Sequence, residues 1–482
     1  MTALQPDNTS DPPARLIARL EAIVGRGNVL HSKADRFVYG YDASVFRGRP
    51  AKAVALPGST GEVAELVRLA NSEGLAFVAR GAGTGINGGA LPQEDLLVIE
   101  LSRMNRILEV DPDNRLVVVE PGVVNQDLKL FLAKRGFGFS YVPDPGSQVV
   151  STIGGNVGNN AGGMHCLKYG VTSNHIAGLE VVLPGGEIIE VGGKTPDRPG
   201  MDLTGFFVGS EGTLGIVTRI IARILPLPEA VLTQLALFPD LDSAARAVSG
   251  IMAAGILPAA LELLDRRSMT LVDRAVHIGF PDAAGSALII ELDGVREGLE
   301  IEVGRVREIC TANDAVEIQT AETPEAADRI WLARRAAYGA MARISPTIYI
   351  ADGCVPRNRL SEAIGRAIEI CARKGLEVIN LAHAGDGNLH PLIPYDQTIP
   401  GEKEKVIEAA RELLAMCVEM GGTITGEHGI GVEKQEEMTL LFNGRELDAM
   451  FSLKLAFDPA DRCNPRKIFP VAMFDRLQLS GP

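Results

Sequence analysis

The sequence has few of the residues that mark several large protein classes. Aromatic side chains make up 5% of its 482 residues, and there is a single tryptophan. No apolar run reaches the roughly 18 residues that a membrane-spanning helix needs. Basic residues are also outnumbered, because 47 Lys and Arg stand against 61 Asp and Glu, which gives a net charge of −14. Nucleic acids and anionic membrane surfaces would repel such a chain, so neither is expected as a partner.

The six cysteines are scattered, and no two of them form a CxxC pair. This spacing argues against a zinc ribbon, a redox dithiol and an iron–sulfur cluster held by this chain alone. Residues 1–13 are polar and carry neither the basic n-region nor the apolar h-region of a signal peptide. A cytoplasmic location is therefore expected, and attachment to the inner membrane through partners stays open.

Apolar periodicity and turn signals predict a chain that mixes helices and strands. A helix over 60–73 is expected to begin at an N-cap, Thr60. After the prolines of 226–228, short strands near 231–238, 258–264, 286–293, 315–319, 347–351 and 376–382 alternate with helices, which suggests two ferredoxin-like halves. The predicted division is a tail and helix over 1–30, a first domain over 31–228, a second over 229–444 and a C-terminal segment over 445–482.

Glycine is abundant, with 53 residues, and it is concentrated in three clusters over 81–89, 154–163 and 209–215. The first cluster fits GxGxxG, but Pro92 follows where a Rossmann loop would open a helix. No Lys-Ser or Lys-Thr follows any cluster, which excludes a P-loop. The remaining interpretations are tight turns that use positive φ and backbone N–H groups that cradle a phosphate. Three clusters so close together favour a cofactor site.

These clusters, together with Val78–Gly85, Pro143–Pro145, Ile153–Asn156, Asn160–Gly163 and Asn464–Lys467, resemble the FAD-binding domain of vanillyl-alcohol-oxidase-type flavoproteins. Within that family the chain is most similar to the flavin subunit of glycolate oxidase and to D-lactate dehydrogenases. The resemblance covers residues 30 to 470. It implies an α+β fold with a two-subdomain FAD-binding domain of the PCMH type, a ferredoxin-like α/β substrate (cap) domain and a C-terminal helical segment that returns to the FAD domain.

The resemblance also implies which residues bind FAD. Residues 80–89 contain no histidine, so the FAD is expected to be non-covalent. His165 either lies near the flavin ring or has a packing role. The residues expected to bind FAD are Arg80, Gly81, Ala82, Gly83, Thr84, Gly85, Asn87, Pro143, Asp144, Ser147, Gly154, Gly155, Asn156, Asn160, Gly163, Glu211, Gly212, Gly215, Ile216 and Asn464.

Three of the seven histidines fall within one short stretch, at 383, 390 and 428. Asp386-Gly387 predicts a two-residue hairpin turn, which would pair His383 directly with His390 on one face of the sheet. With Glu427 they would form a two-histidine, one-carboxylate site for zinc, manganese or iron. The alternative is a histidine pair that bonds to backbone. The segments HxGDGNxH and GEHG resemble the metal motifs of 2-hydroxy-acid dehydrogenases, which favours the metal.

The reaction expected from these features is the FAD-dependent oxidation of a small D-2-hydroxy acid, glycolate or D-lactate, to its 2-oxo acid. Arg334, in a WxxR segment that matches the family, would hold the substrate carboxylate, with Arg335 as the alternative. His428 would remove the hydroxyl proton, since an unperturbed imidazole titrates near pH ~6.5. The hydride would pass to the flavin and then to an iron–sulfur or membrane-associated partner subunit.

Three further interpretations stay open: a D-2-hydroxyglutarate dehydrogenase, an FAD oxidase of another alcohol, and a non-catalytic metal-binding or scaffold subunit. A non-catalytic metal-binding or scaffold subunit would not explain the three glycine clusters. An oxidase of another alcohol would not explain the set of His383, His390 and Glu427. The strand over 347–351 lacks the basic residue that relatives acting on dicarboxylates tend to carry, which favours a monocarboxylate. A homo-oligomer is also compatible with the sequence.

Overall fold

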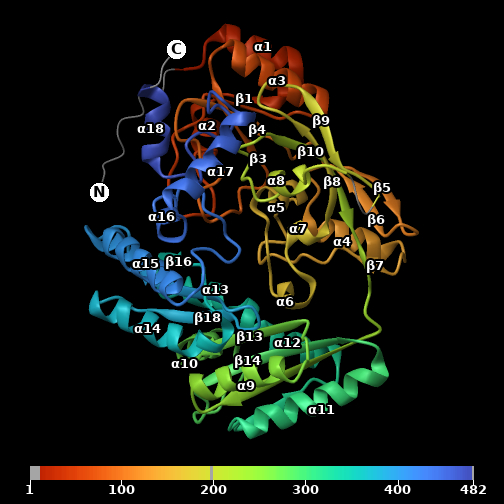
Figure 1. Cartoon of the computed structure of the whole chain (residues 1–482), viewed down its shortest axis with the longest axis vertical. Coiled ribbons are helices and arrows are strands. Elements are labelled where there is room, and N and C mark those ends of the chain that lie inside the picture. Colours follow the sequence, from red (N-terminus) through yellow and green to blue (C-terminus); the bar gives the residue numbers. More distant parts are fainter. Residues whose placement is uncertain (1–10, 196–198, 480–482) are drawn as a thin grey trace. The chain divides into compact units, whose positions relative to one another are not determined.

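The computed structural model describes residues 11–195 and 199–479, and they form two compact units (Figure 1). The central unit comprises Met164–Gly170 and Pro228–Gly426. The terminal unit comprises the described residues up to Gly163, Val171–Leu227 and those from Glu427 onward. In the terminal unit the C-terminal helices, blue in Figure 1, lie beside the red and orange N-terminal elements. None of the described helices is long and apolar enough to cross a membrane.

The central unit is built on one antiparallel sheet with strand order β15-β12-β14-β13-β18-β19-β16, and β17 extends it beside β19. Its elements are β12 (Ala230–Phe238), α9 (Leu241–Ala253), β13 (Ala260–Asp265), α10 (Arg266–Val276), β14 (Ser286–Gly294), α11 (Arg296–Ala312), β15 (Glu317–Thr320), α12 (Pro324–Arg335), α13 (Ala337–Met341), β16 (Thr347–Ile350), β17 (Gly353–Cys354), η2 (Arg357–Arg359), α14 (Leu360–Arg373), β18 (Ile379–His383), β19 (Asn388–Tyr395), α15 (Glu402–Glu419) and the short α6 (Cys166–Tyr169).

The order β15-β12-β14-β13 is that of a βαββαβ ferredoxin-like half, in which the first strand lies between the third and the fourth. The second half repeats the pattern through β16, α14, β18, β19 and α15. Where its fourth strand would follow, the chain makes only an isolated bridge between Cys354 and Thr423. Each of the six strands predicted for this region is found, and β19 is the second strand of the predicted hairpin, although α10 and α15 were not expected.

One face of this sheet carries the apolar core of the unit. Strand residues such as Leu235, Ile289 and Leu381 pack there against Met269 of α10, Trp331 of α12 and Met341 of α13. Because side chains alternate along a strand, every second residue of each strand points to this face. The few polar side chains that share it are therefore buried among apolar neighbours, and they form the candidate site described below.

The terminal unit contains two larger sheets, which fits the expected two-subdomain arrangement. The first, β1-β2-β4-β3, pairs β2 and β3 in parallel with β4, and the second, β5-β6-β10-β8-β9, is antiparallel. Its elements are α1 (Ala14–Val24), η1 (Arg26–Asn28), β1 (Val29–Leu30), α2 (Lys33–Val38), β2 (Ala53–Ala55), α3 (Thr60–Ser72), β3 (Ala76–Arg80), β4 (Leu96–Glu100), β5 (Ile107–Asp111), β6 (Leu116–Val119), α4 (Asn125–Lys134), β7 (Phe139–Ser140), α5 (Ile153–Asn159), α7 (Thr172–His175), β8 (Ile176–Val182), β9 (Ile188–Gly192), α8 (Leu203–Phe207), β10 (Ile216–Arg223), β11 (Leu225–Pro226), α16 (Met438–Leu441), α17 (Gly444–Phe457) and α18 (Val471–Leu479).

Local capping differs from the prediction at α3. The N-cap is Ser59, not Thr60, because the Ser59 side chain accepts a hydrogen bond from the backbone N–H of Glu62. Thr60 instead donates its hydroxyl to Glu180 Oε1 at 2.7 Å, which ties the first sheet's helix to β8 of the second sheet. Core residues of α3, such as Leu66, share one apolar cluster with Val182 and Ile216 of the second sheet.

Candidate functional site

A row of polar side chains crosses the apolar face of the central sheet. Glu262 of β13 lies opposite His383 of β18, which lies opposite Asn388 of β19. In the next row, the unbroken register of β16 and β17 with β19 places Asp352 opposite His390. All five side chains are buried. Buried polar groups in such positions need specific partners, so this row is the candidate site of the unit.

Glu262 bonds two side chains at once. One of its carboxylate oxygens accepts a hydrogen bond from His383 Nδ1 at 2.5 Å, and the other accepts one from Arg334 Nε at 2.6 Å. Burial alone would raise the pKa of this carboxyl. The positive charges of His383 and Arg334 and their hydrogen bonds outweigh burial, so the pKa of Glu262 is lowered.

Helix α12 brings Arg334 to this carboxylate. Trp331 and Arg334 are three residues apart and therefore lie on the same side of the helix. Trp331 Nε1 donates to Glu291 Oε2 at 2.7 Å on β14, the strand next to Glu262. The WxxR segment thus spans two neighbouring strands and bonds one carboxylate on each. Among the described residues, the side chain of Arg334 bonds a carboxylate through its Nε, and neither Nη group has a hydrogen-bond partner there.

The hairpin between β18 and β19 differs from the prediction. His383 pairs with Asn388, and His390 pairs with Leu381, so the turn has four residues instead of two. The His383 carbonyl closes this turn by accepting the N–H groups of Asp386 and Gly387. The predicted register was wrong by two residues, which preserves the face. The two imidazoles remain neighbours on the diagonal, with ring centroids 4.9 Å apart and planes at 89°.

The segment after the Cys354–Thr423 bridge approaches the same row. Asp352 accepts the Thr425 hydroxyl at 2.6 Å and the Gly426 backbone N–H at 3.0 Å. A Cβ on Gly426 would come within 2.3 Å of the Asn388 side chain, so only glycine fits there. Thr425 and Gly426 are therefore held against Asp352 and Asn388, which lie opposite His390 and His383 in the sheet.

The donor set fits a divalent metal ion. His383 Nδ1 bonds to the Glu262 carboxylate, which is the contact that orients the imidazole in a carboxylate–histidine–metal arrangement. His390 lies beside it in a buried setting. Glu427, the expected third ligand, follows Gly426 directly in the chain. His428 belongs to the terminal unit, where its carbonyl accepts the side-chain amide of Asn159 at 2.8 Å.

His165 has a partner in the central unit. Its Nε2 lies 2.9 Å from Glu291 Oε1, and its ring lies 6.1 Å from that of Trp331. Nearby, Asp293 of β14 binds Lys168 and accepts the Tyr169 hydroxyl at 2.5 Å. These contacts fix Met164–Gly170 on the sheet, which supports the packing interpretation of His165.

In the terminal unit, the first glycine cluster forms the loop between β3 and β4, where Ala82, Thr84 and Gly85 also lie. An added Cβ on Gly81 would come within 2.5 Å of Thr152 Oγ1, and Gly83 has φ +68°. Arg80, at the end of β3, has its guanidinium over the Tyr39 ring. Its Nη1 is buried without a hydrogen-bond partner among the described residues. Burial lowers the Arg80 pKa. A buried donor of positive charge at this loop fits a phosphate of FAD.

The second cluster forms α5, which sequence inspection missed because of its glycines. Its N-cap Thr152 accepts the Gly155 N–H. A Cβ on Gly154 would lie 2.4 Å from Pro121, and one on Gly163 would lie 2.4 Å from the Asp144 carbonyl oxygen. Close packing therefore requires glycine at both positions. The other predicted residues of this region are engaged in the same packing: Asn156 and the Pro143 carbonyl both accept from Asn125, the Ser147 carbonyl caps a turn, and Asn160 ends α5 with φ +53°.

Three predicted cofactor residues that are far apart in sequence meet in one buried cluster. Asn87 donates to Glu211 Oε2 at 3.0 Å, and Glu211 Oε1 accepts the backbone N–H groups of Ile430 and Gly431. Asn464 donates to the carbonyls of Gly89 and Glu211 at 2.9 and 2.7 Å. Their side chains thus tie the first and third glycine clusters to each other, to the two residues that follow the GEHG segment and to the C-terminal segment.

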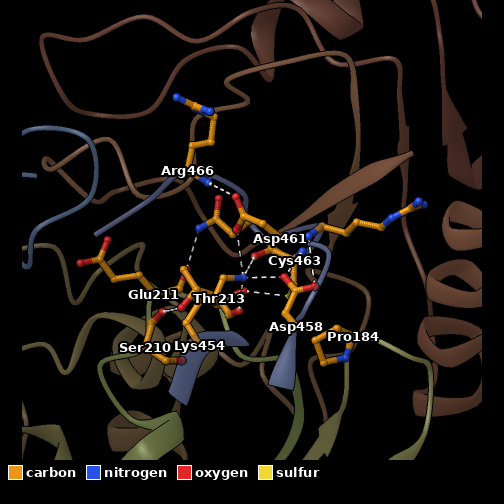
Figure 2. Close-up of polar contacts among 12 residues, drawn as sticks. Pro184, Ser210, Glu211, Thr213, Lys454, Asp458, Asp461, Cys463 and Arg466 are labelled. Carbon is orange, nitrogen blue, oxygen red and sulfur yellow. Dashed lines mark hydrogen bonds and ion pairs between the residues drawn. The ribbon is translucent and has the colours of Figure 1, made fainter. Parts of the chain in front are cut away.

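The C-terminal segment is itself held by charged groups (Figure 2). Lys454 of α17 donates to the Thr213 carbonyl at 2.9 Å and to Asp458 at 2.5 Å, and it lies 3.2 Å from Asp461. Cys463 is fully buried and its thiol donates to the Gly212 carbonyl, while Gly215 and Ile216 lead from this cluster into β10. Sequence inspection missed Lys454. Its signal was a lone lysine in the apolar run LKLAF.

Lys467 completes this attachment and was also missed as a functional residue. Its ammonium donates to the carbonyls of Gly88 and Leu91 at 3.0 and 2.6 Å, within the first glycine loop. Burial lowers the pKa of Lys467 to about 7, although the charges of Glu211 and Asp42 act in the opposite direction. The first loop is therefore positioned by groups from the opposite end of the sequence.

Two family models and several curated proteins match this chain. Residues 51–192 match the family model described as FAD binding domain, and residues 227–468 match FAD linked oxidases, C-terminal domain. The glycolate oxidase subunit GlcD of Bacillus subtilis is 42% identical over 94% of this chain and 96% of its own length. A D-lactate dehydrogenase of Archaeoglobus fulgidus is 34% identical over 86% of this chain and 90% of its own length.

Solved structures show the fold. A p-cresol methylhydroxylase structure superposes with a TM-score of 0.80 at 17% identity, covering 95% of this chain and 97% of that one. An alkyldihydroxyacetonephosphate synthase structure gives 0.74 at 21% identity, covering 95% of this chain and 86% of that one. The expected α+β class and FAD-binding domain are confirmed.

Proposed function

Because the chain belongs to the family of FAD-linked oxidases, we propose that the bound FAD and a divalent metal ion serve the oxidation of a monocarboxylic D-2-hydroxy acid, glycolate or D-lactate. The chain is an FAD-dependent oxidoreductase that oxidises a small 2-hydroxy acid to its 2-oxo acid. The observation that carries the finer proposal is the pair of buried imidazoles, 4.9 Å apart, next to Glu262, which Arg334 bonds.

In this proposal Arg334 holds the substrate carboxylate through its Nη groups, since its Nε is already engaged by Glu262. His383, His390 and Glu427 hold a zinc, manganese or iron ion. His428 removes the hydroxyl proton. When bound, FAD supplies the acceptor for the hydride and the metal lowers the pKa of the substrate hydroxyl. Asp352 contributes by fixing the backbone that leads to Glu427 and His428.

The terminal unit would hold FAD non-covalently. Arg80 offers a buried positive donor, and Gly81, Gly83 and Gly163 permit close backbone approach. The remaining predicted residues, among them Asn87, Glu211 and Asn464, act by positioning these loops. Asn160, Gly155 and Asn156 serve the same end through α5.

The substrate experiment is anaerobic flavin bleaching. Glycolate, D-lactate and D-2-hydroxyglutarate are each mixed with the purified holoenzyme, and the fall in flavin absorbance is followed. Strand β16 and Ala351 carry no basic side chain for a second carboxylate. We therefore expect glycolate or D-lactate to bleach the flavin faster than D-2-hydroxyglutarate. Faster bleaching by D-2-hydroxyglutarate, or bleaching only by a non-acid alcohol, would contradict the proposal.

The electron acceptor is proposed to be a separate iron–sulfur or membrane-associated subunit. The relatives with 38% and 42% identity are themselves named as subunits, and the cysteines of this chain are too far apart in sequence to hold a cluster. The reduced holoenzyme should react slowly with oxygen and rapidly with an artificial electron acceptor. Rapid peroxide production by the purified chain would contradict this part.

A further inference from the structure

We infer that Glu262 is a positioning residue that couples the metal site to the substrate-carboxylate site. This inference rests on the proposed function. Its geometric basis is that the two oxygens of one fully buried carboxylate bond two different groups, His383 Nδ1 at 2.5 Å and Arg334 Nε at 2.6 Å. His383 is proposed to bind the metal ion and Arg334 the substrate carboxylate, so one carboxylate orients both groups.

The arrangement determines what each partner can do. A hydrogen bond from Nδ1 fixes the tautomer and ring plane of His383, as an outer-shell carboxylate does for a ligating histidine. On the other oxygen, the bond from Nε fixes the guanidinium plane of Arg334 and leaves the Nη groups for a bidentate contact with a carboxylate. Glu262 itself has no exposed surface. Its effect on the reactants therefore passes through these two side chains.

If Glu262 only stabilised the sheet, another buried carboxylate that links the same strands should have the same effect when it is replaced. Asp265 is a buried carboxylate on the same strand, but its position places it on the opposite face of the sheet. It accepts the backbone N–H and side-chain amide of Asn380 on β18, at 2.9 and 3.0 Å, and it caps α10 through Ser268. Asp265 thus links the same two strands as Glu262 does, without touching His383 or Arg334, and it provides a matched control.

The test compares Glu262→Gln with Asp265→Asn and Arg334→Met in the purified holoenzyme. Metal affinity is measured by competition with a chromophoric chelator, using Zn²⁺ and Mn²⁺ as probes, and substrate affinity from the concentration dependence of anaerobic flavin reduction. Glu262→Gln should weaken metal binding by about 10–100-fold, the usual effect of losing an outer-shell carboxylate. It should also weaken substrate binding by at least about 10-fold.

The controls separate the possible causes. Arg334→Met should weaken substrate binding but leave metal affinity within about threefold, and Asp265→Asn should leave both unchanged even if it lowers the melting temperature. If Glu262→Gln does not fold, Glu262→Asp keeps the charge but is too short to reach both partners, so at least one affinity must fall. Unchanged metal and substrate affinities in a folded Glu262 variant would overturn the inference. A wild-type protein that binds no metal would instead refute the proposed function.

Discussion

The C-terminal segment should control FAD binding, and Asn464→Ala tests this. Asn464 is buried, and its side-chain amide bonds the carbonyls of Gly89 in the first glycine loop and Glu211 in the third. Its own backbone N–H bonds Phe77 of β3 at 2.7 Å and would remain in the variant. The substitution therefore removes the Asn464 bridge between the two loops, while the Asn87–Glu211 hydrogen bond and the attachment of the segment to the sheet remain.

The magnitude follows from these two bonds. A buried hydrogen bond contributes about 1 kcal/mol, and leaving its acceptor without a donor costs about 1–3 kcal/mol. We expect the Asn464→Ala substitution to destabilise the arrangement of the two loops by about 2–4 kcal/mol of free energy. Since about 1.4 kcal/mol corresponds to a tenfold change in binding, FAD affinity should fall by at least about 10-fold.

The assay is titration of apoprotein with FAD, followed by quenching of flavin fluorescence, beside thermal unfolding of apoprotein and holoenzyme. Asn380→Ala is the matched control, because Asn380 is equally buried and also donates from its amide, but in the central unit. It should lower stability and leave FAD affinity unchanged. An Asn464→Ala protein that binds FAD as tightly as the wild type would refute the assignment of this segment to loop positioning.

Two further changes test the terminal unit. Burial lowers the pKa of Lys467 to about 7. Above this pH the folded chain has released a proton that the unfolded chain keeps up to pH ~10. The contribution of Lys467 to the free energy of unfolding therefore increases as pH rises from about 7, by at most ~1.4 kcal/mol per pH unit. Melting temperatures of the wild type should rise relative to Lys467→Met between pH 7 and 9, and parallel profiles would contradict this. Gly163→Ala should lower the melting temperature of the apoprotein and weaken FAD binding, because its Cβ would meet the Asp144 carbonyl at 2.4 Å. Gly61→Ala, at an exposed helix position with no atom closer than 3.8 Å, should do neither; equal effects of the two substitutions would show that backbone crowding is not the cause.

The sequence predicted most of the central sheet because its strands are short, apolar and separated by clear turn signals. It failed where local signals compete with neighbours. Asp386-Gly387 favours a two-residue turn, but the pairing of β18 with both β13 and β19 fixes a four-residue turn. Both registers keep His383 and His390 on one face, so the prediction of neighbouring histidines did not depend on the error.

The sequence also contains a signal for two buried carboxylates of the site, Glu262 and Glu291. Glu262 stands alone between leucines in ALELLD, and Glu291 stands in LIIELDG. A carboxylate within an apolar strand is buried only when it is paired. The buried cluster of Asn87, Glu211 and Asn464 could not be read in this way, because its members are separated by more than a hundred residues and their contacts depend on tertiary folding. Resemblance located these residues, whereas the structure shows that their side chains hold the loops together.

In the proposed mechanism, buried histidines on the sheet hold a metal ion that the reaction needs. Elemental analysis of the purified holoenzyme, combined with single-turnover flavin reduction by D-lactate or glycolate before and after chelation, tests it most directly. We expect bound zinc, manganese or iron, whose removal leaves the flavin absorption bands intact but stops their bleaching. The His390→Ala variant should behave in the same way. A wild-type protein that contains no metal and reduces its flavin at full rate in the presence of chelator would show that the reaction does not need this ion.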